Sequence, residues 1–408
     1  MRDSAEGKWV SAEGKTLSFI KSADAPAGEE LLWEPGCTYV LPELRIRNNG
    51  KLALKYKVTV NGATGDTKLL EAIDFTVKKN GANEGEKLEG WEGHLLPAGT
   101  LATDSESSEI QFAISGHMKE AAGNEYQGLT LNGIGLTVVA TQYTYEYDSN
   151  DNQYDAEAEL PAVAGNTDDL NALITGATTD GKATIALPAN AEVTLDNGIA
   201  HEGDKSRDVT IIGDGSQTVD VASKAISAEG AKHLNYQRGS TFTFENLTIE
   251  NGTDTYDGIV CDELIYKNCT IKGVTTLYGK ATFIDCKFEN TMANQYSIWT
   301  WGGTDVTFEN CVFNTNGKAI LLYGQATSEK PTNLTVTNCT FNDRNNGTAG
   351  KAAIEIGNDY NATYTLTVNN VTVNGFANGK NTGSKVWANK NSMDAAHLTV
   401  TIDGTKVQ

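Results

Sequence analysis

A set of aromatic residues in the second half of the chain has the spacing that suits carbohydrate binding. Segments 297–301, 319–323 and 353–356 each alternate between residues of two kinds. Alternate residues of a strand point to opposite faces, so one face is apolar and the other carries aromatic rings. Flat rings of this kind stack against sugars. The predicted glycan-contacting residues are Trp299, Trp301, Tyr323 and Glu355, together with Tyr278 and Trp387 if their segments keep the same register.

A second interpretation of the same face is structural. Large exposed apolar patches usually bind something, but the binder can be a loop, another domain or a neighbouring subunit. Both interpretations fit the sequence. In the first the aromatic face binds a carbohydrate, and in the second it is covered by protein.

Acidic residues near 254–263 form the densest acidic group of this half of the chain. Asp254, Asp257 and Asp262 have the carboxylate oxygens that Ca²⁺ prefers, which makes them the predicted metal site. The alternative is that they are solvated acids in turns. Apart from this optional Ca²⁺, no cofactor is expected.

Motifs for enzymatic chemistry are scarce, and no catalytic residue is predicted. A β-elimination lyase needs a basic residue near a carboxylate-held cation, and a hydrolase needs two placed carboxylates. Basic residues near the aromatic face are not grouped with an acidic cluster, and the five histidines are isolated. The basic residues near the aromatic face are Arg238, Lys280, Arg344 and Lys385. The sequence therefore leaves open whether the chain is an enzyme, and it favours a protein without enzymatic activity.

The aromatic and acidic residues named above lie between copies of a repeat. Each copy is a short alternating strand, followed by Asn or Asp, then by Cys, Leu or Val, and then by a second strand. The copies have Asn246, Asn268, Asp285, Asn310, Asn338 and Asn370 at the shared position. Asn and Asp tolerate the left-handed backbone of a tight bend. The unequal gaps fit constant strands joined by loops of varying length. The repeat predicts a parallel β-helix with a ladder of Asn side chains at one corner.

Four of the six cysteines follow this Asn or Asp directly, at 269, 286, 311 and 339. In-register stacking keeps side chains about 4.8 Å apart, which does not suit the geometry of a disulfide. They are predicted to be free thiols packed as small hydrophobic groups.

Charge and hydropathy exclude several classes of partner. The formal net charge is −21, which disfavours binding to nucleic acids and to anionic lipid. No apolar run reaches the roughly 18 residues of a membrane span. The first residues lack the hydrophobic core of a signal peptide, which fits either a cytosolic protein or a mature secreted form.

Residues 1–147 predict an antiparallel β-sandwich or jelly-roll. Alternating strands are expected at 15–21, 37–48, 53–60, 73–78, 109–115 and 133–147, with a short helix at 67–73. Residues 148–165 are acidic and Asn-rich, and they are interpreted as a linker.

Several motifs of this first part occur in the order seen in a known family. They are Trp33-Glu34-Pro35-Gly36, Arg47-Asn48-Asn49-Gly50, Gly93-His94-Leu95-Leu96-Pro97 and Gly133-Ile134-Gly135-Leu136. On these motifs the region resembles the TasA/camelysin family of secreted fibre-forming proteins. The resemblance implies a jelly-roll domain, a cell-surface or matrix location and self-association into fibres. The family has also been associated with protease activity, but this sequence has no His-Glu-x-x-His motif.

Residues 166–408 are predicted to form the β-helix, preceded by a short helix at 166–174 with Thr167 as its N-cap. A helix there would cover the open end of the first coil. This helix, the segment Gly181–Asn190 and the Asn-Cys repeats resemble the pectate-lyase-like β-helix superfamily, a resemblance that concerns fold and not activity.

The sequence therefore predicts an all-β protein: an antiparallel jelly-roll followed by a right-handed parallel β-helix with a helical cap. The predicted function is adhesion or assembly at a bacterial cell surface or matrix, with the β-helix as spacer or glycan-binding module. The alternative is a polysaccharide lyase or glycoside hydrolase anchored by the jelly-roll.

Overall fold

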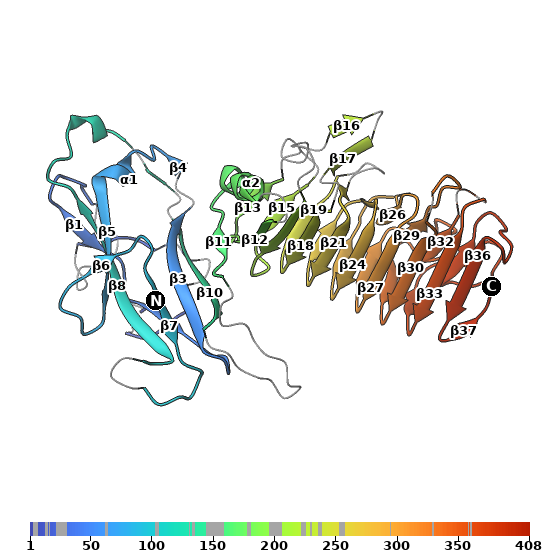
Figure 1. The fold of residues 1–408 in the computed structure, drawn as a ribbon, viewed down its shortest axis with the longest axis horizontal. Helices are drawn as coiled ribbons and strands as arrows, with labels where there is room; N and C mark the ends of the chain where they lie inside the picture. The colour runs from blue at the N-terminus through green and yellow to red at the C-terminus, as the bar shows by residue number, and fades with distance from the viewer. Residues whose placement is uncertain are drawn as a thin grey trace. The chain divides into compact units, whose positions relative to one another are not determined.

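The computed structural model divides the chain into two compact units, Met1–Gly165 and Asn166–Gln408 (Figure 1). It describes the chain except residues 3–6, 13–14, 16, 22–30, 62–63, 103–105, 130, 133–134, 144–158, 178–180, 196–205, 222–225, 229–230, 236–238, 253–257, 294, 329, 358 and 360. The N-terminal part of the predicted linker, 148–158, lies outside the described residues.

Unit 1 is an antiparallel β-sandwich. One sheet has the order β1-β8-β5-β6 with β2 also paired to β8; the other has the order β10-β3-β7, and β4 pairs with β9. The strands are β1 Thr38–Val40, β2 Leu44–Arg47, β3 Leu54–Asn61, β4 Thr64–Gly65, β5 Ile73–Lys79, β6 Glu86–Lys87, β7 Glu92–Leu95, β8 Glu109–Met118, β9 Leu131–Asn132 and β10 Gly135–Gln142. Helix α1 spans Leu69–Ala72, the 3₁₀ helix η1 spans Asn124–Tyr126, and the short strand β11 spans Ala162–Val163.

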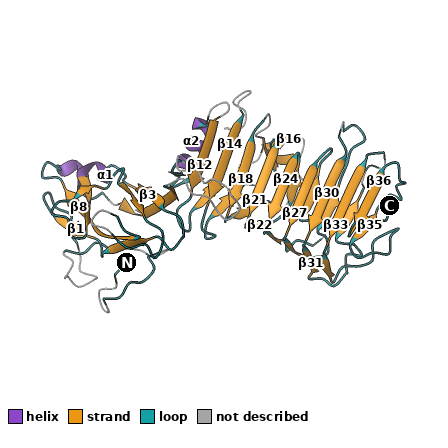
Figure 2. Cartoon of the chain, turned by 60° about the horizontal axis from the view of Figure 1, so that its bottom comes forward, coloured by secondary structure: helices purple, strands orange, loops and turns teal. Residues whose placement is uncertain are grey.

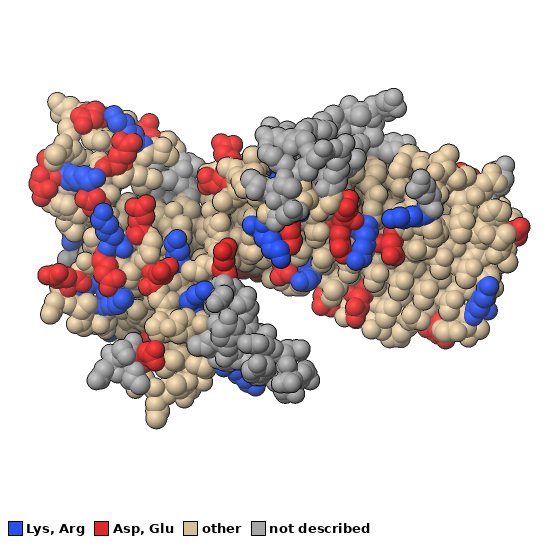
Figure 3. Space-filling view, viewed as in Figure 1, with Lys and Arg blue, Asp and Glu red and all other residues tan. Residues whose placement is uncertain are grey.

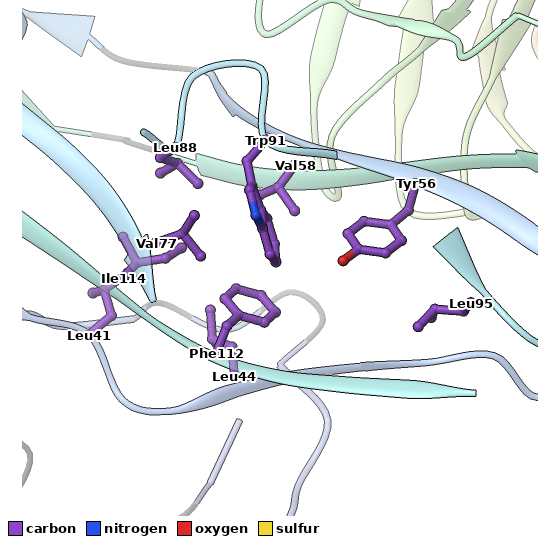
Figure 4. Packing of buried hydrophobic residues seen from close by; sticks show 10 residues of the cluster. All are labelled: Leu41, Leu44, Tyr56, Val58, Val77, Leu88, Trp91, Leu95, Phe112 and Ile114. Atoms are coloured by element: carbon purple, nitrogen blue, oxygen red, sulfur yellow. The ribbon is translucent and has the colours of Figure 1, made fainter. Parts of the chain in front are cut away.

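The core of unit 1 lies between its sheets, as Figure 4 shows. Trp91 is its centre: its ring lies 5.6 Å from that of Tyr56 and 4.8 Å from that of Phe112, measured between centroids. Strand β7, which begins directly after Trp91, was not among the predicted strands, because only a short alternating run surrounds it. The strand predicted at 37–48 is divided in two, β1 and β2, on either side of Leu41-Pro42-Glu43. Proline breaks a strand because it donates no ladder hydrogen bond.

Unit 2 is a right-handed parallel β-helix. Its longest sheet, called the long sheet, runs β12-β14-β18-β21-β24-β27-β30-β33-β36-β37, and Figure 2 shows its strands side by side. Their bounds are β12 Gly181–Ala186, β14 Arg207–Ile212, β18 Thr241–Glu245, β21 Glu263–Lys267, β24 Lys280–Ile284, β27 Asp305–Glu309, β30 Thr332–Thr337, β33 Tyr364–Asn369, β36 Leu398–Ile402 and β37 Thr405–Lys406.

A second sheet follows the long sheet around each coil. Its order is β13-β15-β19-β22-β25-β28-β31-β34. The bounds are β13 Glu192–Thr194, β15 Thr218–Asp220, β19 Thr248–Glu250, β22 Thr270–Lys272, β25 Lys287–Glu289, β28 Val312–Thr315, β31 Thr340–Asp343 and β34 Thr372–Asn374.

The remaining strands form the third side of the coils. Near the N-terminal end of unit 2, β16 Ile226–Ala228, β17 Ala231–Asn235 and β20 Ile259–Val260 form a small sheet. Further along, five strands form what is called the third sheet, in the order β23-β26-β29-β32-β35. They are β23 Thr275–Leu277, β26 Ile298–Thr300, β29 Ile320–Leu322, β32 Ile354–Ile356 and β35 Trp387–Asn389.

The predicted corner ladder is confirmed. All six repeat positions have left-handed backbone, with φ between 50° and 57°. Asn268 donates to Asn246 at 2.8 Å and Asn370 donates to Asn338 at 2.8 Å, so the side chains bond to their copies in neighbouring coils. At these six bends between the long and second sheets, the turn is made by Asn or Asp, which tolerate this conformation better than other residues apart from Gly.

The interior is filled by ring stacks and thiols. Phe283 stacks between Tyr266 and Phe308, at 4.7 and 4.8 Å, while Phe313 stacks between Phe288 and Phe341. The four repeat cysteines are free and buried, as predicted. In-register pairing places aromatic residues one above another in neighbouring coils.

A helix covers the first coil, as predicted from the sequence. Helix α2 spans Thr167–Gly176, packs on β12 and β13, and buries Leu170 and Ile174. Its N-cap is Asn166, whose side chain accepts from the Asp169 amide, and not Thr167. Thr167 instead accepts a hydrogen bond from the Thr194 backbone at 3.1 Å. Among the described residues, no helix is both long and apolar enough to cross a membrane.

Candidate functional site

The strand register of the third sheet decides which predicted site residues share a face. Thr276, Trp299, Leu321, Glu355 and Ala388 pair in sequence across the five strands and form the outward column. The residue directly after β26 or β29 is again outward, and there the chain has Trp301 and Tyr323. The corresponding residue after β23 is Tyr278.

Three of the predicted aromatic residues come together on this face. The rings of Trp301 and Tyr323 are stacked with centroids 5.1 Å apart and planes 3° from parallel, and Trp299 lies 6.3 Å from Tyr323. All three are partly exposed. Trp299, Trp301 and Tyr323 are called the aromatic ledge below. Tyr278 is also partly exposed, one coil before it.

The prediction was wrong for Trp387. This residue pairs with Ile354, which is an inward position, and only 7% of it is exposed. The strand β35 begins at Trp387 itself, whereas the corresponding strand β26 has Trp299 as its second residue. A shift of one residue in register moves a side chain to the other face, and the sequence around Trp387 gave no means of fixing that register.

Glu355 lies at an outward position but is not exposed. Only 2% of it reaches solvent, and the outward Leu321 and Ala388 beside it are buried as well. Glu355 accepts from the Ala352 amide at 3.3 Å and lies 3.3 Å from the ammonium of Lys351. This part of the outward face is thus covered, and its acid is held in a partly dehydrated place.

Two further lysines approach the same acid. The ammonium of Lys318 lies 5.2 Å from the centre of the Tyr296 ring, and the Tyr296 ring meets Trp299 edge-on at 5.4 Å. Lys390 follows β35 directly, and its backbone amide donates to Ile356. Lys318, Lys351 and Lys390 are called the lysine cluster below.

Electrostatics show that the members of the lysine cluster act on one another. Burial lowers the pKa of Lys318, and the charges of Lys351 and Lys390 lower that pKa further. Burial likewise lowers the pKa of Lys390, and Lys351 adds to the effect. Glu355 opposes both shifts. Burial, reinforced by the charge of Glu355, raises the pKa of the Tyr296 phenol. Both directions follow from taking charged groups out of water.

Unsatisfied polar atoms are concentrated in the coil that contains Trp299. The indole nitrogen of Trp299 and the hydroxyls of Ser297 and Thr304 are buried without a hydrogen-bond partner among the described residues. An N–H buried without an acceptor costs free energy.

The predicted Ca²⁺ site is not assembled in the described part of the chain. Asp254 and Asp257 lie outside the described residues, and Asp262 is exposed. Among the residues that the structure describes, no group of three or more His, Cys, Asp or Glu side chains could hold a metal ion.

The basic residues considered in the sequence lie elsewhere. Lys280 is on the long sheet, 2.7 Å from Glu263, and Arg344 is paired with Glu289 beyond the second sheet. Lys385 is exposed just before β35, and Arg238 is outside the described residues. None of these is a member of the lysine cluster.

Sequence reasoning missed the lysine cluster although a signal was present. Gly-Lys-Ala occurs at 317–319 and again at 350–352, each time just before a strand of the third sheet. A basic residue repeated at this position of successive coils predicts a basic column. The third lysine, Lys390, comes from the opposite end of its strand and has no such signature.

Comparisons with known proteins add little to these observations. A scan against family models finds no match, and no curated protein matches the sequence. Among solved structures, the Agl-KA catalytic domain is 11% identical with a TM-score of 0.18, covering 91% of this chain and 90% of that one. The catalytic domain of a GH87 alpha-1,3-glucanase, D1069A in complex with tetrasaccharides, is 10% identical with a TM-score of 0.20, covering 90% and 91%. TM-scores this low do not relate the function of this chain to that of these proteins.

Proposed function

We propose that the β-helical unit binds a carbohydrate chain at the aromatic ledge. The observation that carries this proposal is the partly exposed, nearly parallel pair Trp301 and Tyr323 with Trp299 beside it. Rings in successive strands of a rigid sheet are ordered before a ligand arrives, so little conformational entropy is lost on binding.

The geometry of the ledge determines which contacts it offers. Since Trp301 and Tyr323 face each other, their shared faces are occupied, and the ligand meets ring edges and the outer faces of the stack. The edges include the Tyr323 hydroxyl, which suits the mixed apolar and hydroxyl surface of a sugar. The buried indole N–H of Trp299 adds a donor without an acceptor.

Replacing Trp301 by Ala tests this proposal. Binding of the full chain to a set of immobilised neutral and acidic polysaccharides should fall, while the unfolding midpoint stays close to that of the wild type. The control is Thr335→Ala, which removes an outward side chain of comparable exposure from the long sheet. Equal retention of Trp301→Ala and wild-type protein on every polysaccharide that binds would contradict the proposal.

A second candidate function is polysaccharide cleavage by β-elimination. It is favoured by the lowered pKa of Lys318 and Lys390, since a lysine with a lowered pKa is a better base near neutral pH. In this reaction a neutral lysine takes the proton next to a uronate carboxylate. The bond to the leaving oxygen breaks, a carbon–carbon double bond forms, and the leaving oxygen takes a proton from an acid.

Ultraviolet absorbance of the unsaturated product distinguishes cleavage from binding. A steady rise with a polyuronate, lost in Lys318→Met and Lys390→Met, would establish the enzyme. A flat trace with a polyuronate that the protein binds would leave binding as the function of the site.

We also propose that unit 1 places the β-helix in an extracellular matrix, through self-association into fibres. The support is the resemblance of residues 9–155 to the TasA/camelysin family, together with the β-sandwich of unit 1. Electron microscopy of purified protein over several days tests it. Fibres in the full chain, absent after removal of unit 1, are expected; a persistently monomeric protein would contradict it.

A further inference from the structure

We infer that the four stacked cysteines of unit 2 bind a soft monovalent metal ion, copper(I) or silver(I), held in line between two adjacent sulfurs. The cysteines are Cys269, Cys286, Cys311 and Cys339, and they are called the thiol column below. All four are free and buried, with at most 2% of each exposed. The inference is independent of the proposed carbohydrate site, because the column lies inside the coils at the corner between the long and second sheets.

Backbone hydrogen bonds hold the thiol column in register. The carbonyl of each cysteine before the last accepts from the amide directly after the next cysteine, at 2.8–2.9 Å. Cysteines of neighbouring coils are therefore one strand spacing apart, about 4.8 Å. The amide of Cys311 also donates to the sulfur of Cys339 at 3.3 Å. Leu247 and Val371 have the corresponding positions in the coils before and after, so the column contains four thiols.

The four side chains have the same orientation. Each sulfur donates to the carbonyl of the residue two positions before its own cysteine, at 3.2–3.4 Å. Identical orientation on an in-register backbone keeps the sulfurs at the strand spacing as well. The column is thus a row of evenly spaced sulfur ligands.

This spacing selects an ion with two ligands in line. A metal–thiolate bond of about 2.3 Å, the value for zinc, places two sulfurs about 4.6 Å apart across one ion. A disulfide needs its sulfurs about 2.05 Å apart, so the coils would have to move. Zinc itself needs four ligands around one point, and no three His, Cys, Asp or Glu side chains among the described residues converge in this way. Thiolates favour soft ions such as copper(I).

The corner above the column offers a point of entry at Asp285. The described hydrogen bonds of the Asn ladder run up to Asn268 and resume at Asn310, and Asp285 stands between them. Asp285 is exposed and directly precedes Cys286, which has a thiol neighbour on each side. Its carboxylate attracts cations to the surface one residue away from the column.

Binding exchanges protons for the ion without a change of oxidation state. Two S–H bonds break, two metal–sulfur bonds form and two protons pass to water, because the thiolate is the metal ligand. The product carries one negative charge, and the Cys311 amide is positioned to donate to the sulfur of Cys339. The apparent affinity should rise by about a hundredfold per pH unit while the thiols are protonated.

Calorimetric titration of the full chain with silver nitrate, in chloride-free buffer without oxygen, tests the inference. Cys37→Ala and Cys261→Ala are introduced first, so that the thiol column supplies every thiol. This protein should bind two silver ions, each with release of about two protons. X-ray absorption at the silver edge should show two sulfur neighbours for each ion. Absence of binding, or a first shell with nitrogen, oxygen or a third sulfur, would overturn the inference.

Two double variants in this background separate adjacency from the number of thiols. Cys269→Ala with Cys339→Ala leaves the neighbours Cys286 and Cys311 and should bind one ion. Cys286→Ala with Cys339→Ala leaves Cys269 and Cys311, about 9.6 Å apart, and should bind at least about a hundredfold more weakly. Circular dichroism checks that both variants fold. Equal affinity of the two would show that the column does not act through adjacent pairs, and the inference would be wrong.

Discussion

The outward faces of the long sheet and the third sheet follow the same alternation but differ in how exposed their charged groups are. On the long sheet, Lys182 pairs with Asp208 and Lys280 pairs with Glu263 across neighbouring strands. Figure 3 views this face: positive and negative groups lie next to one another on its N-terminal coils, and its C-terminal coils are largely uncharged. On the third sheet, the buried Glu355 pairs with Lys351 near partly exposed aromatic rings.

The same tripeptide contributes to both faces. Gly-Lys-Ala stands at 181–183, 279–281, 317–319 and 350–352. In the first two cases Lys is the second or first residue of a strand of the long sheet and meets an acid on the neighbouring strand. In the last two cases it precedes a strand of the third sheet by two or three residues, and its ammonium lies over the Tyr296 ring (Lys318) or beside Glu355 (Lys351). The position of the tripeptide relative to the strand therefore decides which groups the lysine meets.

Removing the shared interior should disrupt both faces. Phe313→Ala deletes the middle ring of the Phe288–Phe313–Phe341 stack, whose members are buried. A cavity of this kind costs about 3–5 kcal/mol of unfolding free energy. Denaturant titration followed by circular dichroism measures the loss. A cost near zero would show that the coils repack around the gap.

Neutralising the buried acid should lower stability. Glu355→Gln removes the carboxylate that pairs with the ammonium of Lys351, so the unfolding free energy should fall by about 1–3 kcal/mol. The matched change Glu263→Gln, on the long sheet, should cost no more than about 1 kcal/mol. An equal loss of unfolding free energy in the two variants would contradict the proposed difference between the two faces.

Truncating the ledge should affect binding more than folding. Trp301→Ala should weaken carbohydrate binding about tenfold, in the range of a single aromatic anchor. Its effect on the unfolding midpoint should be small because the ring is partly exposed. Titration calorimetry and thermal unfolding on the same sample separate the two. A large drop in the midpoint with unchanged binding would make the ledge structural.

Removing one lysine from each face should change stability with opposite signs. The pKa of Lys390 is lowered by burial, so the folded protein is penalised while this lysine is charged. The penalty is present below the lowered pKa and disappears as pH rises to the unfolded value of 10.5. Lys390→Met should therefore raise the unfolding free energy at pH 7, by less than about 1 kcal/mol.

Lys280 supplies the matched measurement. Its hydrogen bond to Glu263 raises its pKa, so the lysine contributes stability below the unfolded pKa and loses it as pH rises through the folded value. Lys280→Met should slightly lower the unfolding free energy at pH 7, by no more than about 0.5 kcal/mol. Unfolding curves of both variants at pH 7 and at pH 11 test the signs. Shifts of the same sign at pH 7 would contradict the contrast.

Much of the fold of unit 2 was predictable because its cause is local. The Asn and Asp bends, the buried free cysteines and the alternating strands each depend on a few adjacent residues and on repetition. Unit 1 was less predictable, because Trp91, directly before β7, packs against Tyr56 and Phe112 from segments far apart in the chain.

The candidate site was likewise predictable only in the features that depend on adjacent residues. Period-two alternation placed Trp299, Trp301 and Tyr323 on one face, because side-chain direction within a strand is set by the backbone alone. It could not place Trp387, whose direction depends on pairing with Ile354, nor show that Glu355 is covered.

By itself, the sequence determined the β-helix, its corner residues and the direction of most outward side chains. Only the tertiary structure decided which outward residues are exposed and which charges share a partner. Exposure and Coulomb interactions depend on distances between separate coils, and those distances are set by loops whose lengths follow no repeat. The lysine cluster around Glu355 is the clearest case, since its members lie near one another only after the coils have stacked.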